Sequence, residues 1–287
     1  MAEIIYLNGH FIPRSEAKLS PFDHGFLYGY GLFETMRAYN GHIFRLDRHL
    51  TRLRRSAQSL GLAEKLAASD LETACLETLI ANKLKDARLR LTVSAGEGDM
   101  TPDPGTCSEL TVLVTATELT PLPPQKYEQG FKAVLSPLRR DSQSPLSRLK
   151  STCYLNNVLA RMEARAAGAD EAILLNEQGY LAEGSTSNIF LVGKGELITP
   201  SLESGVLPGI TREAVLEIAQ TLNINTAERQ VELKELALAE EAFVTNSVLE
   251  IMPLTQFDGK PIGSGKPGQL TTNLMAAYRK LVETEES

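Results

Sequence analysis

The sequence predicts a mixed α/β (α+β) fold in two domains. Short apolar runs that fit strands alternate with longer segments in which apolar residues recur at helical spacing. At 287 residues the chain is too long for one small domain. A segment with three prolines and no periodicity, Glu118–Gly130, interrupts the pattern. We therefore expect a small N-terminal α/β domain over residues 1–118, a connector over residues 119–130 and a larger C-terminal domain over residues 131–287.

The first domain is expected to begin with two hairpins. Residues 3–13 turn at Asn8-Gly9 and residues 32–46 turn at Asn40-Gly41, and Asn-Gly is a strong signal for a tight hairpin turn. Helices are predicted over Asp47–Leu60 and Ser69–Lys83 from their apolar spacing, and strands over residues 88–95 and 109–117.

The second domain is expected to continue the mixed pattern. Strands are predicted over residues 131–137, 171–176, 188–192, 196–200, 241–247 and 249–257. Cys153–Ala167 carries Leu155, Leu159, Met162 and Ala166 on one helical face. Thr211–Leu222 forms a helix with Thr211 as candidate N-cap and Leu222 facing inward, and Asn273–Glu283 forms the last helix.

Composition excludes several classes of protein. The net charge of −7 disfavours a nucleic-acid binder, although the basic run Arg45–Arg55 leaves a local patch open. Cys75, Cys107 and Cys153 are widely spaced and form no CxxC pair, which argues against a disulfide framework or a zinc site and favours a reducing cytoplasm. The N-terminus does not fit a signal peptide, and no apolar run approaches the length of a membrane span.

One lysine occupies an unusual place. Lys150 lies between an extended stretch and the start of a helix rather than on a polar helix face. An ordinary surface lysine is the commoner interpretation. The alternative is a Schiff-base lysine, whose amine is kept neutral by desolvation and by a nearby cation such as Arg148.

Three further segments fit a site for a phosphorylated heterocycle. Glu183 precedes a run of small residues and is either a solvated turn acid or a carboxylate that keeps a ring nitrogen protonated. The Pro-Gly turn of Gly205–Gln220 leads into a helix whose first amides, at Ile210 and Thr211, could bind a phosphate. Within the basic run, Arg52 lies opposite part of the apolar stripe, whereas Arg48, Arg54 and Arg55 are expected in solvent.

Together these pieces resemble one family. "HLTRL" (49–53), "KSTCYLNN" (150–157), "AEGSTSNIF" (182–190) and "GVLPGITR" (205–212) are similar to motifs of the class IV aminotransferases, which are fold-type IV enzymes dependent on pyridoxal 5′-phosphate. Residues 23–41 and 243–253 resemble the same family, so the resemblance covers residues 3–280 or so. It implies a small N-terminal domain, a C-terminal pseudo-barrel domain and a homodimer with shared active sites.

The resemblance also implies roles for single residues. Lys150 would form the internal aldimine and later move a proton between the substrate α-carbon and the cofactor. Glu183 would pair with the ring nitrogen, Tyr154 with the ring hydroxyl, and Leu207 would pack behind the ring. The phosphate would be held by Arg52, Ile210, Thr211 and Ser247. The substrate side would comprise Tyr28, Phe33, Thr35, Arg37, Arg88, Arg90 and Val248, and no metal is implied.

The reaction is less determined than the family. Transfer of an amino group between a small or apolar amino acid (or amine) and a 2-oxo acid is the favoured function, and 4-amino-4-deoxychorismate lysis to 4-aminobenzoate and pyruvate is the alternative. The loop Gly96–Ser108 has three acids and no base, unlike the arginine-bearing loop of the D-amino acid enzymes and some of the lyases. Arg90 matches the strand arginine of the branched-chain enzymes, but Arg88 replaces their tyrosine, and Thr35 and "TNSVLEI" look more like the lyases. A non-catalytic relative would be expected to have lost Lys150 or Glu183, and both are present.

Overall fold

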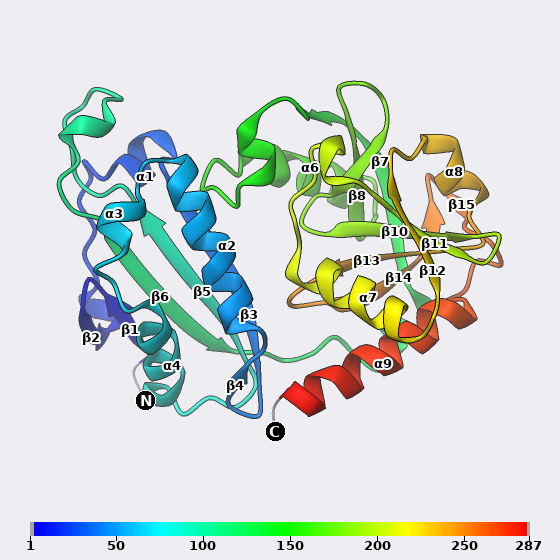
Figure 1. Cartoon of the computed structure of the whole chain (residues 1–287), viewed down its shortest axis with the longest axis horizontal. Coiled ribbons are helices and arrows are strands. Elements are labelled where there is room, and N and C mark those ends of the chain that lie inside the picture. Colours follow the sequence, from blue (N-terminus) through cyan, green and yellow to red (C-terminus); the bar gives the residue numbers. More distant parts are fainter. Residues whose placement is uncertain (1–2, 286–287) are drawn as a thin grey trace. The chain divides into compact units, whose positions relative to one another are not determined.

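The computed structural model describes residues 3–285, which form two compact units (Figure 1). The first unit comprises residues 3–120 and 149–153, and the second comprises residues 121–148 and 154–285. Residues 149–153 belong to the first unit because their backbone pairs with its strand β3 (Gly31–Tyr39). Phe33 N–H donates to the Lys150 carbonyl and Thr152 N–H donates to the Gly31 carbonyl, both at 2.9 Å. The domain boundaries expected from the sequence stay a prediction.

The first unit is built on an antiparallel sheet. Its strands are β1 (Ile4–Leu7), β2 (His10–Pro13), β3, β4 (His42–Ile43), β5 (Ala87–Ser94) and β6 (Thr111–Glu118), in the order β2-β1-β6-β5-β3-β4. Both predicted hairpins are confirmed. Asn8 and Asn40 adopt positive φ angles of 48° and 47°, and each is followed by a glycine with positive φ, as the tight turns of hairpins require.

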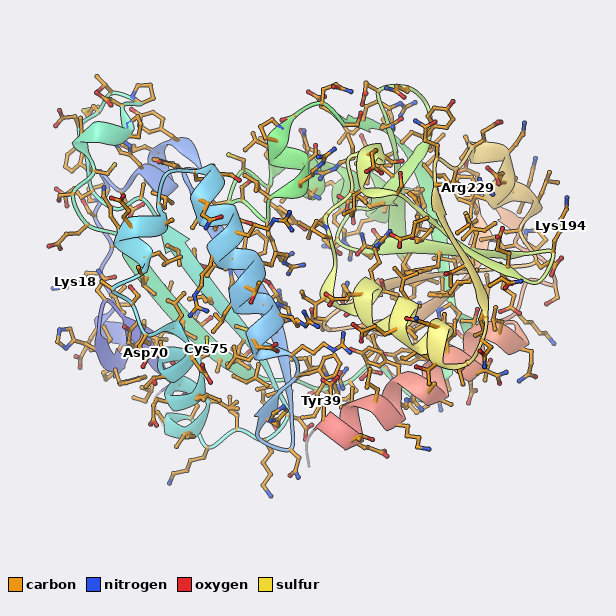
Figure 2. The ribbon with its side chains drawn as sticks, in the orientation of Figure 1. Lys18, Tyr39, Asp70, Cys75, Lys194 and Arg229 are labelled. Atoms are coloured by element: carbon orange, nitrogen blue, oxygen red, sulfur yellow. The ribbon has the colours of Figure 1, made fainter. Side chains whose placement is uncertain are left out.

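Helices cover one face of this sheet. Those on this face are α2 (Leu46–Ser59), α3 (Ala63–Leu66) and α4 (Leu71–Ala81), whose buried side chains join the core. The unit also contains α1 (His24–Tyr28) and short 3-10 turns at Arg14–Glu16 and Pro104–Thr106. Asp70 caps α4 through the Thr73 N–H, and Cys75 on α4 is fully buried (Figure 2). Leu32, Met36 and Ala38 of β3 belong to the core beneath α2 and α4. Because side chains alternate along a strand, Phe33, Thr35 and Arg37 lie on the opposite face of the sheet.

The second unit contains a larger, mixed sheet. Its strands are β7 (Phe131–Arg140), β8 (Glu171–Asn176), β9 (Leu181–Gly184), β10 (Asn188–Gly193), β11 (Glu196–Pro200), β12 (Asn225–Arg229), β13 (Glu241–Asn246), β14 (Glu250–Phe257) and β15 (Lys260–Pro261). The order is β12-β11-β10-β13-β14-β7-β8-β9, with β15 beside β14. The sheet curls so that β9, at the end of this path, lies near β10 and β11, which agrees with the expected pseudo-barrel.

The helices of the second unit differ from the prediction in several details. They are α5 (Pro124–Gln129), α6 (Leu155–Ala166), α7 (Ile210–Thr221), α8 (Leu233–Leu238) and α9 (Gln269–Glu285), with 3-10 turns at Pro145–Arg148 and Leu202–Ser204. The expected connector contains α5. Gly209 rather than Thr211 is the N-cap of α7, and Leu222 is 47 % exposed instead of inward.

Helix α6 packs against the sheet with the face opposite to its apolar face. Leu155, Leu159 and Met162 are exposed, whereas Asn157, Ala160 and Ala164 are buried. The small side chains of Ala160 and Ala164 pack with Ala172 and Leu174 of β8. The apolar spacing therefore predicted the helix correctly, but the apolar face is exposed and does not pack against the sheet.

Among residues 3–285 the structure contains no helix with both the length and the apolar character that a bilayer span needs.

Candidate active site

Lys150 lies over an aromatic ring on the sheet face of the first unit that carries Thr35 and Arg37. Its ammonium nitrogen is 4.6 Å from the centroid of the Phe33 ring, and the Arg90 guanidinium carbon is 3.9 Å from the same centroid. The two cations therefore lie at most 8.5 Å apart. Lys150 itself is half-buried, and Arg148 is exposed. The structure thus brings together three residues that the sequence assigned to catalysis and substrate binding.

Further arginines lie on the same sheet face. In the register of β3 and β5, Thr35 is opposite Arg90 and Arg37 is opposite Arg88. Arg37 is buried with its guanidinium carbon 4.4 Å from the Tyr39 ring centroid, whereas Arg88 is exposed. These strands therefore align three guanidinium groups on one face, which makes it suited to binding carboxylates.

Tyr28 contacts the acidic loop Gly96–Ser108. The Tyr28 hydroxyl donates to the carbonyl of Met100, which lies within Gly96–Ser108. His24, on the same short helix, is buried and its Nε2 lies 2.7 Å from the Asp99 carbonyl. The loop is thus attached to α1 at two places.

Arg52 belongs to a buried polar cluster between α2 and β3. Its Nε donates to Glu34 Oε1 at 2.8 Å and its Nη2 donates to Oε2, while His49 Nδ1 donates to Oε2 at 2.7 Å. Burial alone would raise the pKa of Glu34, but the charges and hydrogen bonds of Arg52 and His49 hold this pKa at about 2. Burial lowers the pKa of His49, against the effect of Glu34. Sequence analysis identified Arg52 but missed Glu34 and His49.

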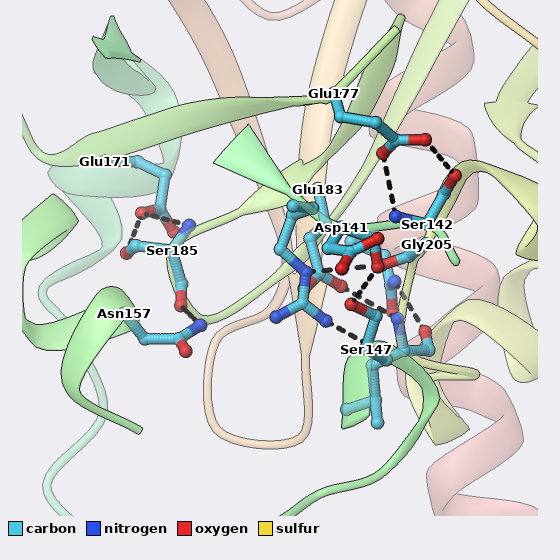
Figure 3. Close-up of polar contacts among 12 residues, drawn as sticks. Asp141, Ser142, Ser147, Asn157, Glu171, Glu177, Glu183, Ser185 and Gly205 are labelled. Carbon is cyan, nitrogen blue, oxygen red and sulfur yellow. Dashed lines mark hydrogen bonds and ion pairs between the residues drawn. The ribbon is translucent and has the colours of Figure 1, made fainter. Parts of the chain in front are cut away.

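In the second unit, both carboxylate oxygens of Glu183 are engaged. Glu183 lies in β9, so it is a buried strand residue rather than a turn acid. Oε1 is 3.1 Å from Arg140 Nε, and Oε2 accepts from the Leu207 N–H at 2.9 Å (Figure 3). A carboxylate has about four acceptor positions in all, so contacts at both oxygens are compatible with a further N–H donor.

At the start of α7, the Asn188 side chain lies close to the backbone of Leu207 and Gly209. Asn188 Nδ2 donates to the Leu207 carbonyl at 2.9 Å, and a Cβ at Gly209 would lie only 2.0 Å from Asn188 Oδ1. Among residues 3–285, no side chain caps this helix, although its first amides, including those of Ile210 and Thr211, have no acceptor within the helix. These amides are therefore suited to binding an anion.

The remaining predicted residues lie at the ends of other elements. Tyr154 is the N-cap residue of α6. Ser247 and Val248 form the turn between β13 and β14, where Asn246 Oδ1 accepts from the Val248 N–H at 2.9 Å. Within residues 3–285, no cluster of three or more histidine, cysteine or acidic side chains is arranged to hold a metal ion.

The model of the class IV aminotransferase family matches residues 31–257 of this chain. The chain belongs to the class IV aminotransferases. It is therefore an enzyme of this pyridoxal-phosphate-dependent family, as the sequence predicted.

Individual class IV aminotransferases resemble the whole chain. Aminodeoxychorismate lyase of Bacillus subtilis is 40 % identical over 285 residues, which is 98 % of this chain and 95 % of the relative. A Methanocaldococcus jannaschii protein, named provisionally as a branched-chain-amino-acid aminotransferase, is 40 % identical over 280 residues and covers 96 % of both chains. The crystal structure of the Escherichia coli branched-chain amino acid aminotransferase superposes with a TM-score of 0.92 at 31 % identity, covering 98 % of this chain and 95 % of that one. The fold expected from the sequence is confirmed.

The residues present fit the family's cofactor, pyridoxal 5′-phosphate. A buried carboxylate oriented by the Leu207 N–H suits a protonated ring nitrogen, and the first amides of α7 suit a phosphate. The sequence did not predict a role for Arg140. Nothing in the strand "FKAVLSPLRR" distinguishes Arg140 from its neighbour Arg139, and only the structure shows that Arg140 contacts Glu183.

Proposed function

We propose that this class IV aminotransferase transfers the amino group of a small or apolar amino acid to a 2-oxo acid. The observation that carries the proposal is the position of Lys150 and Arg90 around one Phe33 ring, at most 8.5 Å apart. In a 2-amino acid the amine and the carboxylate carbon are about 2.5 Å apart. A substrate whose amine takes the place of the Lys150 amine, and whose carboxylate points toward Arg90, would have its carboxylate carbon within about 6 Å of the Arg90 guanidinium carbon.

Pyridoxal phosphate supplies the electron sink that makes the substrate α-proton acidic. In the first unit, we propose that Lys150 holds the cofactor covalently and afterwards carries the proton, and that Arg52 binds a phosphate oxygen. A lysine released at the reacting carbon is a base already in position, which accounts for much of its efficiency. Phe33, Thr35, Arg37, Arg88 and Arg90 would line the substrate side, together with Tyr28.

In the second unit, we propose that Glu183 accepts a hydrogen bond from the protonated ring nitrogen and that Tyr154 contacts the ring hydroxyl. Leu207 would pack behind the ring, and its peptide is held on both sides by Glu183 and Asn188. Ile210, Thr211 and Ser247 would donate to the phosphate. Val248 would contact the substrate.

Lysis of 4-amino-4-deoxychorismate is the second candidate. Its support is Thr35, which lies opposite Arg90 in the strand register, together with the 40 % identity to the Bacillus subtilis lyase. The alignment of Arg37, Arg88 and Arg90 suits a substrate with more than one carboxylate, which both reactions provide through 2-oxoglutarate or aminodeoxychorismate.

A substrate panel separates the two reactions. The loaded enzyme is mixed with L-leucine, D-alanine or R-1-phenylethylamine, each with 2-oxoglutarate or pyruvate, and separately with aminodeoxychorismate alone. We expect an amino acid product from the L-leucine mixtures. Formation of 4-aminobenzoate and pyruvate as the only reaction would refute transamination and establish the lyase.

A homodimer is proposed as well, and the exposed face of α6 supports it. Leu155, Val158, Leu159 and Met162 are between 38 % and 68 % exposed and recur at helical spacing. We expect Met162→Asp to shift sedimentation toward the monomer, whereas Lys280→Asp, at an exposed position of α9, should not. A dimer unaffected by Met162→Asp would remove α6 from the interface.

The other partner assignments also stay predictions. Of the basic run Arg45–Arg55, Arg45 is buried and Arg52 is largely so, which leaves fewer cations for nucleic acid than the sequence indicated. A cytoplasmic location is consistent with the three cysteines, all of which are free thiols.

A further inference from the structure

Arg140 connects three segments of the second unit around Glu183. It is the last residue of β7, and its side chain is 16 % exposed. Nε lies 3.1 Å from Glu183 Oε1 and donates to the Gly205 carbonyl at 3.2 Å, while Nη2 donates to the Ser147 carbonyl at 2.6 Å. Figure 3 shows Glu183, Gly205 and Ser147, the three residues that these contacts join. One side chain thus fixes a strand, the loop before Leu207 and the turn that precedes Lys150 in sequence.

This arrangement determines the orientation of the carboxylate. Arg140 holds Oε1, and the Leu207 N–H holds Oε2 at 2.9 Å. The turn at Ser147 is itself anchored, because its hydroxyl donates to the Asp141 carbonyl at 2.6 Å. Ser142 is held by Glu177, whose Oε2 accepts from the Ser142 N–H at 2.8 Å. The segments next to Arg140 are therefore themselves fixed by hydrogen bonds, which restricts the position of its guanidinium beside Glu183.

The charge of Arg140 affects where a shared proton resides. A carboxylate that binds a protonated ring nitrogen can remain an anion or take the proton itself. A guanidinium does not give up its proton at physiological pH and, in contact with a carboxylate, stabilises the anion. The anion leaves the proton on the ring, where it is needed for the ring to accept electrons.

We propose that Arg140 is a positioning residue that keeps Glu183 ionised and oriented, so that the proton stays on the cofactor ring nitrogen. The inference rests on the proposed role of Glu183. A purely structural role for Arg140 would stabilise the fold without affecting the protonation of the ring.

The experiment uses pyridoxal phosphate labelled with a nitrogen isotope in the ring, bound to the full-length enzyme. The nitrogen chemical shift is compared in the parent, Arg140→Gln and Arg140→Lys, and kcat and KM are measured alongside. Arg161→Gln is the matched control, because Arg161 Nη1 lies 3.8 Å from the buried Glu171 in the same unit.

In Arg140→Gln we expect the ring nitrogen signal to move toward that of an unprotonated pyridine and kcat to fall by about a hundredfold, with KM changed far less. Arg140→Lys keeps a cation and should retain the parent signal, as should Arg161→Gln. A parent-like signal in Arg140→Gln would overturn the inference, and so would an unprotonated signal in Arg140→Lys if Arg140→Gln does not fold. A parent enzyme that binds no pyridoxal phosphate would instead refute the proposed function.

Discussion

Replacing Glu34 with glutamine should destabilise the first unit strongly. The substitution keeps the size of the side chain but removes the charge that pairs with Arg52 and His49. The Glu34 pKa is about 2 in the fold against 4.5 ordinarily. Since one pKa unit corresponds to about 1.4 kcal/mol, a pKa lower by about 2.5 means that the ionised form contributes about 3.5 kcal/mol at neutral pH. Removing one partner of a buried ion pair generally costs about 3–5 kcal/mol, which agrees.

The pH dependence provides a second signature. The pKa of Glu34 is lowered in the fold, so its contribution is fully present above pH 4.5 and is lost as the pH falls toward 2. The difference in unfolding free energy between the parent and Glu34→Gln should therefore be largest near neutral pH and shrink below pH 4.5.

Urea unfolding followed by circular dichroism measures this difference, since the chain has no tryptophan for fluorescence. Glu77→Gln, an exposed glutamate on α4 of the same unit, is the matched control and should leave stability unchanged. A Glu34→Gln enzyme within about 1 kcal/mol of the parent at neutral pH, or a difference that does not change with acidification, would refute the account of this cluster.

Three further predictions follow from the same geometry. Lys150→Ala should abolish turnover and prevent borohydride from attaching the cofactor to the protein, while circular dichroism stays that of the parent; covalent attachment in this variant would point to a different lysine. Glu183→Gln should lower kcat by about a hundredfold or more, because a neutral amide cannot favour a protonated ring, and parent-like turnover would exclude Glu183 from that role. Cys153, which is exposed, should react with iodoacetamide in the native enzyme, whereas Cys75, whose pKa burial raises to about 12, should react only after unfolding; mass spectrometry of labelled peptides distinguishes them.

Much of the fold could be predicted from local sequence. Asn8-Gly9 and Asn40-Gly41 turn their hairpins because these residues tolerate positive φ, which needs no long-range information. The apolar spacing of Leu50, Leu53 and Ala57 predicted α2, and the same residues are buried in the core. Motifs identified the family, because the segments around Lys150, Glu183 and Ile210 occur together in one chain, and the family model matches residues 31–257.

Tertiary structure decided which side chains act together. Glu34 and Arg52 are 18 positions apart and meet only because α2 packs on the face of β3 that carries Glu34. Arg140 and Glu183 meet because β7 and β9 both flank β8. The spacing in α6 predicted that its apolar face would be buried. Instead the face with Ala160 and Ala164 packs on β8, and the sequence of the helix alone does not determine this contact. Local sequence thus determined the helices, the strands and the candidate side chains. Long-range packing determined which side chains orient the candidate residues and stabilise their charges.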